Sequence, residues 1–457
     1  MSNSNKNIKE LDMTRGNLFK QILVFCLPLV LANLLQMLFN VSDIVVVGQF
    51  AGASALGSVG SDSQLVSLLV DFFLGMSTAV NVFTARYFGA NSDKDVHETV
   101  HTSFLILMSA GVLFAVLGVI FSPAILSMMG TKEELLDGAV LYLRIYLYGI
   151  PGTALYDWGN GVLSAIGDTK RPLIYLFIAG VVNVILNLTL VCGFNMGVAG
   201  VAIASAVSQW ISGLLVLFTL LRSSASYGFK FKDVRFYKEK TKKLFFMSYL
   251  NGFQFAIYQI ANIIIQSAVN TFDTITVEGI AAAANVDGIV YTMMTAFYTG
   301  CSSFIGQNYG AGDKKRMLKS YFISMSYAFL IALVMGTVIF VRPRFILSLF
   351  TNDPAVIEAG VLRMKIMAAS YCISAFMDCT TAASRGLGRT VVPTILVILG
   401  SCVFRVIWVA TIFAHFRTVE SLFSLYVCSW TLTAAIEMIY FFRVFKRDTK
   451  DMKTVTA

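Results

Sequence analysis

Charged residues are scarce in this chain, and their scarcity excludes most classes of soluble protein. Only 13% of the 457 residues are charged, 57% are hydrophobic, and the mean hydropathy is +0.73. A soluble domain of ordinary composition carries about 25% charged residues. The seven cysteines are odd in number and scattered without metal-type spacing. Neither a disulfide framework nor a cysteine zinc site is therefore expected.

Long apolar runs dominate the sequence instead. A hydrocarbon core about 30 Å thick requires about 20 apolar residues per helical span, and runs of this size recur along the whole chain. We therefore predict an all-α polytopic membrane protein with twelve transmembrane helices. The expected spans are 18–48, 53–87, 100–121, 137–163, 173–193, 198–221, 244–270, 277–308, 320–341, 358–384, 391–413 and 421–443.

The net charge is +9, but the distribution of Lys and Arg along the chain indicates a membrane topology and not a nucleic-acid partner. Most of the Lys and Arg residues lie in segments that would share one side of the membrane, as the positive-inside rule requires. Both termini are expected in the cytoplasm and the protein in the cell (plasma) membrane. The basic segments are the N-tail, 85–98, 167–172, 222–243, 312–319, 385–389 and the C-tail.

The two halves of the chain repeat at a constant displacement of 221 residues, so that Gly89 matches Gly310 and Gly167 matches Gly388. Each half holds an even number of expected spans, so the halves are predicted to be parallel repeats related by a pseudo-two-fold axis along the membrane normal. The expected organisation is a cytoplasmic N-tail (1–17), an N-lobe (18–221), a cytoplasmic linker (222–243), a C-lobe (244–443) and a cytoplasmic C-tail (444–457).

Asp43 places a carboxylate inside the first apolar run. An ionisable residue at membrane depth is costly and usually faces a protein interior or a watery cavity. Asn33, Gln36 and Asn40 precede it at helical spacing, so the four residues are expected to form one polar stripe. Asp43 is therefore the first candidate for a functional group.

Several short motifs occur in the order that is typical of the multidrug and toxic compound extrusion (MATE) family, and the chain resembles this family over nearly its whole length. They are Ser42-Asp43, Val47-Gly48, Ala55-Leu56-Gly57, 86–90 (RYFGA), 197–205 (GVAGVAIAS) with Gln209, 306–311 (GQNYGA) and 385–390 (RGLGRT). The resemblance implies an antiporter that exports organic, often cationic, compounds in exchange for inward protons or sodium ions. It also implies twelve helices in two bundles.

The resemblance further implies an N-lobe site for the coupling ion, formed here by Asp43, Asn183, Asn187 and Ser205. Family members typically carry a second acid where this chain has Asn187. An amide supplies a carbonyl oxygen suited to a hard cation but cannot titrate. Two interpretations remain open: Asp43 alone carries a proton, or Asp43 binds sodium together with amide and hydroxyl oxygens.

Other polar residues at membrane depth are secondary candidates for coupling or substrate binding. Asp157 and Asp378 are related by the repeat, and Asp71 lies in the second span, where a helix–helix hydrogen bond is an equal alternative. Asn285 and Asp287 are expected in a solvated vestibule. The remaining candidates are Gln254, Tyr258 and Asn262 on the seventh helix, and Tyr291 and Met294 on the eighth.

The stretch from His97 to His101 reads H-E-x-x-H, a spacing that places two zinc ligands on one helical face. A catalytic zinc needs three protein ligands, and no companion acid is evident. A metal site at His97 and His101, and with it a membrane-embedded zinc enzyme, is therefore rejected.

We thus expect a secondary antiporter, not an enzyme, that takes small organic cations or drug-like compounds. The protein is expected to be surrounded by membrane lipid. No cofactor is expected beyond the coupling ion, H⁺ or Na⁺. One chain provides both lobes, so a functional monomer is expected. The alternative is a lipid-linked oligosaccharide flippase, whose pyrophosphate substrate would require Arg or Lys in the cavity; only Arg405 is predicted to lie deep within a span.

Overall fold

The structure, a computed structural model, describes residues 11–450 and Met452. All its regular elements in this part of the chain are helical. The first half contains α1 (Leu18–Val46), η1 (Val47–Ala51), α2 (Ala53–Gly89), α3 (Asp93–Met128), α4 (Glu133–Leu147), α5 (Ile150–Ala165), α6 (Lys170–Asn187), η2 (Leu188–Gly193) and α7 (Gly197–Arg222). A single 3₁₀ turn, η3 (Phe231–Asp233), follows in the linker.

The second half is also helical. It contains α8 (Lys238–Val269), α9 (Thr274–Ala311), α10 (Lys314–Val341), α11 (Pro343–Leu347), α12 (Pro354–Gly386), α13 (Val391–Val397), η4 (Ile398–Val403), α14 (Phe404–Trp408), η5 (Val409–Phe413), α15 (Ala414–Phe416) and α16 (Val419–Asp448). The π-helix η2 and the π-helix η5 lie one repeat displacement apart, so the repeat extends to this local irregularity.

Nine helical segments of the described chain are long and apolar enough to cross a membrane. The other three expected spans correspond to α8, α12 and the pair α4 and α5. The continuous span predicted over 137–163 is wrong in detail, because α4 ends at Leu147 and α5 starts at Ile150. Pro151 occupies the first turn of α5, where its missing N–H is tolerated, and so favours a new helix start.

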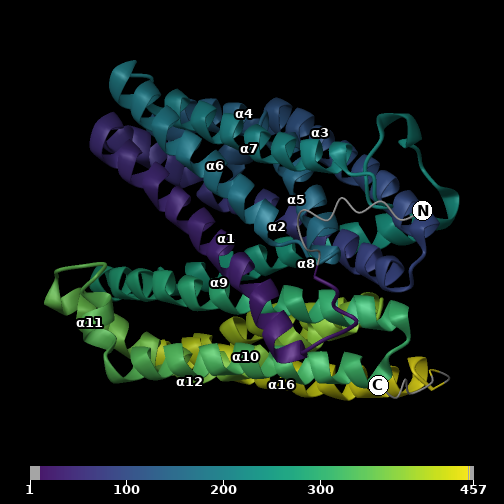
Figure 1. Cartoon of the computed structure of the whole chain (residues 1–457). Coiled ribbons are helices and arrows are strands. Elements are labelled where there is room, and N and C mark those ends of the chain that lie inside the picture. The colour runs from purple at the N-terminus through teal and green to yellow at the C-terminus, as the bar shows by residue number, and fades with distance from the viewer. Residues whose placement is uncertain (1–10, 451, 453–457) are drawn as a thin grey trace.

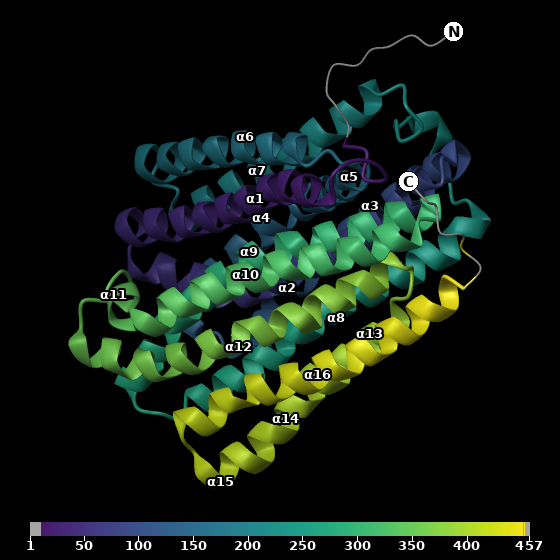
Figure 2. The same ribbon diagram turned by 60° about the horizontal axis from the view of Figure 1, so that its bottom comes forward.

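The described part of the chain forms two hydrophobic cores, and each includes part of a helix from the other half of the sequence. The C-lobe core contains Leu18, Ile22 and Phe25 from the start of α1, packed with α9, α10, α12 and α16. The N-lobe core contains Leu244 and Met247 from the start of α8. Each lobe is therefore stabilised by the first turns of the other lobe's first helix. Figure 1 shows α1 running from one bundle to the other, and Figure 2 shows α10, α12 and α16 running side by side.

The two lobes approach each other closely where α2 and α9 end. A Cβ on Gly89 would lie 2.0 Å from the carbonyl oxygen of Gln307, and a Cβ on Gly310 would lie 1.9 Å from that of Arg86. These two contacts exchange under the 221-residue displacement, so they are equivalent across the repeat. Only glycine permits the two backbones to approach this closely.

Candidate functional site

Asp43, near the C-terminal end of α1, lies against α6 and α7. Asn187 donates a hydrogen bond to Asp43 Oδ1 at 2.5 Å, and Ser205 donates one to Asp43 Oδ2 at 3.2 Å. Asn187 also donates to Asn183 Oδ1 at 3.1 Å, because residues four apart share one face of α6. The structure therefore brings together the four residues named for the ion site: Asp43, Asn183, Asn187 and Ser205.

The electrostatics of this cluster are those of an uncompensated acid. Both donors to the carboxylate are neutral, and no ion pair within the described residues reaches Asp43. Asn187 is fully buried, and its carbonyl oxygen Oδ1 has no hydrogen-bond partner. A buried acceptor left without a donor is costly. A proton on Asp43, or a hard cation held by these oxygens, would satisfy the cluster.

The polar stripe predicted on α1 is only partly a site. Asn33 donates to the backbone oxygen of Thr292 on α9 at 3.2 Å, and so links the two lobes. Gln36 and Asn40 are exposed. All four residues of the stripe lie in α1, but they meet different neighbours because α1 passes from one bundle to the other.

Asp71 lies at the interface of the lobes, where it accepts a hydrogen bond from Gln259 of α8. Asn251 of α8 donates to Thr78 of α2 at 2.8 Å nearby on the same helix pair. Asp157 is buried on α5 and interacts electrostatically with Asp71. The contact of Asp71 is thus of the helix–helix kind that the sequence left as an alternative.

The C-lobe holds a second buried polar cluster. Asp378 interacts electrostatically with Arg385 and Arg405. Arg385 donates to Gln254 at 2.8 Å, and Arg405 lies 4.4 Å from the ring centroid of Tyr426.

The remaining candidates have different surroundings. Tyr258 and Tyr291 lie within electrostatic reach of Asp378. Asn262 is exposed, and Met294 is packed in the C-lobe core.

Of the two residues expected in a solvated vestibule, Asn285 is exposed, whereas Asp287 is half-buried and has charged and polar partners. Arg363 of α12 forms an ion pair with it at 2.6 Å, and Tyr371 donates to its other oxygen. Arg363 and Arg385 are both buried as well, although the sequence singled out only Arg405 as deep within a span. Both residues fall close to the predicted helix ends in sequence, and packing by neighbouring helices encloses them.

The sequence of this helical protein is similar to that of a known family. The MatE family model matches residues 28–189 and 252–411, which is more than half of the chain. The chain belongs to the MATE family. It is therefore a multi-pass membrane protein of a transporter family, not an enzyme.

This MATE protein has relatives and structural neighbours along most of its length. It is 28% identical over 365 residues to the probable multidrug resistance protein YpnP of Bacillus subtilis (strain 168), covering 80% of this chain and 81% of the relative. It is 23% identical over 409 residues to the probable multidrug resistance protein NorM of Thermotoga maritima, covering 88% and 86%. A solved outward-facing structure of a multidrug resistance MATE family transporter matches with a TM-score of 0.90 at 20% identity, covering 97% and 99% of the two chains, and so shares its fold.

Two buried acids within the expected spans of this MATE protein were missed by the sequence reasoning. Asp62 on α2 and Glu437 on α16 are both fully buried, and none of their four carboxylate oxygens has a hydrogen-bond partner. Each is an acid within an apolar run, which is the signal that singled out Asp43. The same criterion applied to every span would have found them.

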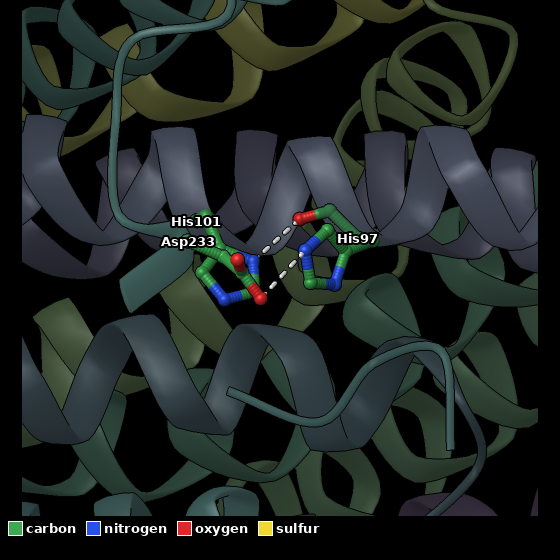
Figure 3. Close-up of side chains that lie close together, drawn as sticks. All are labelled: His97, His101 and Asp233. Carbon is green, nitrogen blue, oxygen red and sulfur yellow. Dashed lines mark hydrogen bonds and ion pairs between the residues drawn. The ribbon is translucent and has the colours of Figure 1, made fainter. Parts of the chain in front are cut away.

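The histidine motif leads to a structural contact in this transporter. Asp233 from the linker lies beside His97 and His101, and the three candidate ligand atoms are within 4.8 Å of one another (Figure 3). The expectation that no companion acid exists is therefore wrong. Both ring nitrogens of His101 are engaged, however: Nδ1 lies 2.7 Å from the His97 carbonyl oxygen, and Nε2 accepts from the Lys230 N–H at 3.0 Å. His101 thus fastens the linker to α3.

Proposed function

We propose that this MATE-family protein is a secondary antiporter. It exports organic, amphiphilic and cationic compounds in exchange for inward protons or sodium ions, by alternating access between its two lobes. The observation that carries the proposal is the Asp43 cluster: a half-buried carboxylate with neutral donors, a nearby unpartnered amide oxygen and no ion-pair partner among the described residues. Such a group gains most from binding a cation, and it lies on α1, the helix that packs in both lobes.

The proposed membrane arrangement has twelve crossings. The nine apolar segments are joined by α8, by α12 and by α4 and α5 acting together. The two lobes are parallel repeats, both termini are cytoplasmic, and the protein lies in the plasma membrane. The reciprocal glycine contacts of α2 and α9 support a two-fold relation between the lobes. Because one chain supplies both lobes, a monomer is sufficient for transport.

The relatives support a drug-like substrate, since YpnP and NorM are described as probable multidrug resistance proteins. A flippase for lipid-linked oligosaccharides remains the second candidate. The argument against it is the small number of deep basic residues, and the buried Arg385 beside Arg405 in the C-lobe weakens that argument. A phosphate group would pair well with such arginines.

The test is transport by purified protein in liposomes. Ethidium efflux is followed under a proton gradient alone and under a sodium gradient alone, and we expect one gradient to drive it. Asp43→Asn should reduce driven efflux by at least about tenfold, the effect of losing 1.4 kcal/mol of coupling. Asp137→Asn, an exposed acid on α4, is the matched control and should transport normally.

Failure of both gradients to move ethidium would refute export of organic cations. Undiminished efflux by Asp43→Asn would refute the assignment of coupling to Asp43. Translocation of a fluorescent pyrophosphate-linked lipid in the same liposomes, without ethidium transport, would favour the flippase.

A further inference from the structure

Arg316, in the first turn of α10, holds the segment that precedes α1. We call this segment, residues 11–17, the strap. Arg316 Nε donates to the Met13 carbonyl oxygen at 2.9 Å and Nη1 to that of Gly16 at 2.8 Å; Nη2 donates to that of Arg15 at 2.8 Å and to Gln21 Oε1 at 2.7 Å. A guanidinium keeps its charge and presents its N–H groups as a rigid fork. One side chain therefore binds the strap and the first turn of α1 together.

The strap is folded so that its carbonyl oxygens converge on this one side chain. Asp12 Oδ1 accepts from the Thr14 N–H at 2.9 Å and from the Thr14 hydroxyl at 2.6 Å, and Gln21 donates to the Asp12 carbonyl oxygen at 2.9 Å. Gly16 has a φ of +83°, a conformation that favours glycine. These local contacts shape the strap, and Arg316 binds the shaped strap to α10.

The strap is also part of the C-lobe by its apolar contacts. Met13 is fully buried in the C-lobe core, and the buried Asn308 of α9 donates to the Met13 carbonyl oxygen at 3.1 Å. The strap is therefore attached to α9 and to α10, both in the same lobe.

The strap contacts the N-lobe as well. Gly167, with a φ of +93°, lies in the turn between α5 and α6, and a Cβ on it would lie 2.5 Å from the Leu11 carbonyl oxygen. In the same turn Thr169 donates to the Phe25 carbonyl oxygen of α1 at 2.9 Å. The strap and the start of α1 therefore lie between the C-lobe and this turn of the N-lobe.

Further contacts between the lobes surround this turn. Gln307 of α9 donates to the carbonyl oxygen of Ala165, the last residue of α5, at 2.6 Å. Arg86 of α2 lies 4.3 Å from the ring centroid of Tyr309 on α9. These contacts adjoin the glycine contacts of α2 and α9, so the strap is one part of a closed contact between the lobes on this side.

The repeat has an equivalent attachment in the N-lobe. Arg316 is the third residue of α10, and the displacement of 221 residues places Asp95, the third residue of α3, at the same position. Asp95 forms an ion pair with Lys240 in the first turn of α8 at 2.5 Å. In each lobe this position fastens the start of the other lobe's first helix, although its charge is reversed. The two lobes thus share the attachment and differ in its chemistry.

We propose that Arg316 is a positioning residue for transport, because it holds the strap as a seal between the lobes on the side proposed to face the cytoplasm. Opening of this side requires Leu11 to separate from Gly167, and a strap fixed by Arg316 opposes that separation. Arg316 thereby sets the ratio of closed to open molecules on this side. This inference rests on the proposed alternating access for its role in transport, whereas the seal itself needs neither substrate nor gradient.

The test is a distance measurement by double electron–electron resonance on the purified full-length protein without substrate or gradient. Spin labels are attached at Lys94→Cys on α3 and Lys319→Cys on α10, both exposed positions, after the two exposed cysteines have been replaced by serine. In Arg316→Ala the ratio of long to short distances should rise at least about tenfold, because each hydrogen bond to a charged group changes an equilibrium by about that factor or more. Lys315→Ala removes an exposed positive charge from the same turn and is the matched control, in which the ratio should not change.

A second pair of variants tests the seal from the N-lobe side. Gly167→Ala places a Cβ against the Leu11 carbonyl oxygen and should also raise the ratio. Gly388→Ala, its equivalent in the repeat, has a similar left-handed backbone with a φ of +76°, but its Cβ would meet the flexible end of Arg86 at 3.1 Å, so the ratio should not change. An unchanged ratio in Gly167→Ala, or an equal rise in Gly388→Ala, would overturn the seal at Gly167.

An unchanged ratio of distances in Arg316→Ala would overturn the proposal. An equal rise in Lys315→Ala would also overturn it, since positive charge alone would then explain the effect. If Arg316→Ala does not fold, Arg316→Lys serves in its place: it keeps the charge, loses the fork and should raise the ratio as well.

Transport separates this proposal from the proposed function. A larger fraction of open molecules raises the apparent affinity on the open side, so the KM for ethidium supplied on that side of the liposomes should fall in Arg316→Ala. A merely structural role would lower the rate without lowering KM, and that result would overturn the role of Arg316 in transport. If wild type itself fails to transport ethidium, the antiport proposal fails, whereas the distances still decide whether Arg316 holds the seal.

Discussion

The two lobes share their helices but differ in how they neutralise buried charge. In the N-lobe, Asp43 and Asp62 have no cationic partner. In the C-lobe, Arg363 pairs with Asp287, and Arg385 and Arg405 lie near Asp378. The positions of the Asp43 cluster are occupied after the displacement by Ile264, Phe404, Trp408 and Tyr426. The repeat therefore preserves backbone geometry, whereas polar chemistry has diverged between the lobes.

This difference separates two roles for buried ionisable residues. A neutralised pair such as Arg363 and Asp287 can hold helices in place, because its charges are satisfied whichever ions are present. An uncompensated acid changes its charge when a proton or cation arrives. The C-lobe also has an acid without a hydrogen-bond partner, Glu437, but this acid lies within electrostatic reach of Arg385. The N-lobe, whose acids Asp43 and Asp62 have no ion-pair partner among the described residues, is therefore better suited to ion coupling, and the following changes would break or sharpen that contrast.

The largest expected effect is on the C-lobe ion pair. Asp287→Asn leaves Arg363 buried without a counter-charge and should destabilise the protein by about 3–5 kcal/mol. Asp62→Asn removes an unpaired buried acid and should not lower stability. Thermal unfolding of the purified variants measures both. Equal losses in the two variants would contradict the contrast, and the double variant Asp287→Leu with Arg363→Met should recover most of the lost stability.

A smaller effect, equal in the two lobes, is expected at the glycines that join α2 and α9. Gly89→Ala and Gly310→Ala each place a Cβ within 2.0 Å of a backbone oxygen and should cost about 1–3 kcal/mol through overpacking. Gly60→Ala and Gly288→Ala, on the same helices but with open space around them, should raise stability by about 0.5–1 kcal/mol. A clear difference between Gly89→Ala and Gly310→Ala would show that the contacts are not equivalent.

Ser205→Ala should distinguish the two coupling ions at a cost of about 1 kcal/mol. Loss of this donor destabilises the Asp43 carboxylate, so for a proton the pH dependence of transport should move to higher pH. If sodium is the coupling ion, loss of a ligand oxygen should raise the sodium concentration needed for half-maximal transport. Tyr426→Phe, at the equivalent C-lobe position, is the control and should change neither quantity.

The smallest effect is expected at the linker. His101→Ala removes the acceptor of the Lys230 N–H and should cost about 1 kcal/mol or less, seen as faster proteolysis within 223–237. His97→Ala, which loses only a 3.5 Å contact with Asp233, should have less effect. Added zinc should leave transport unchanged, because His101 has no free nitrogen; inhibition by zinc that His101→Ala abolishes would contradict this arrangement.

The sequence by itself determined the helical class, the approximate helix bounds and the repeat, because hydrophobic runs of membrane length and turn residues are local signals. It also brought Asp43, Asn183, Asn187 and Ser205 into one hypothesis, through helical spacing and a family resemblance. Asp62 and Glu437 could also have been identified from the sequence, because both are acids within expected transmembrane spans.

Only the tertiary structure decided which polar groups meet. The first turns of α1 and α8 pack in the core of the opposite lobe, and the polar residues further along α1 meet different neighbours. The approach of Asp233 to His97 and the pairing of Arg363 with Asp287 join segments far apart in sequence. Whether the charge of a buried acid is neutralised depends on residues that are distant in the sequence, and local sequence patterns do not predict these neighbours.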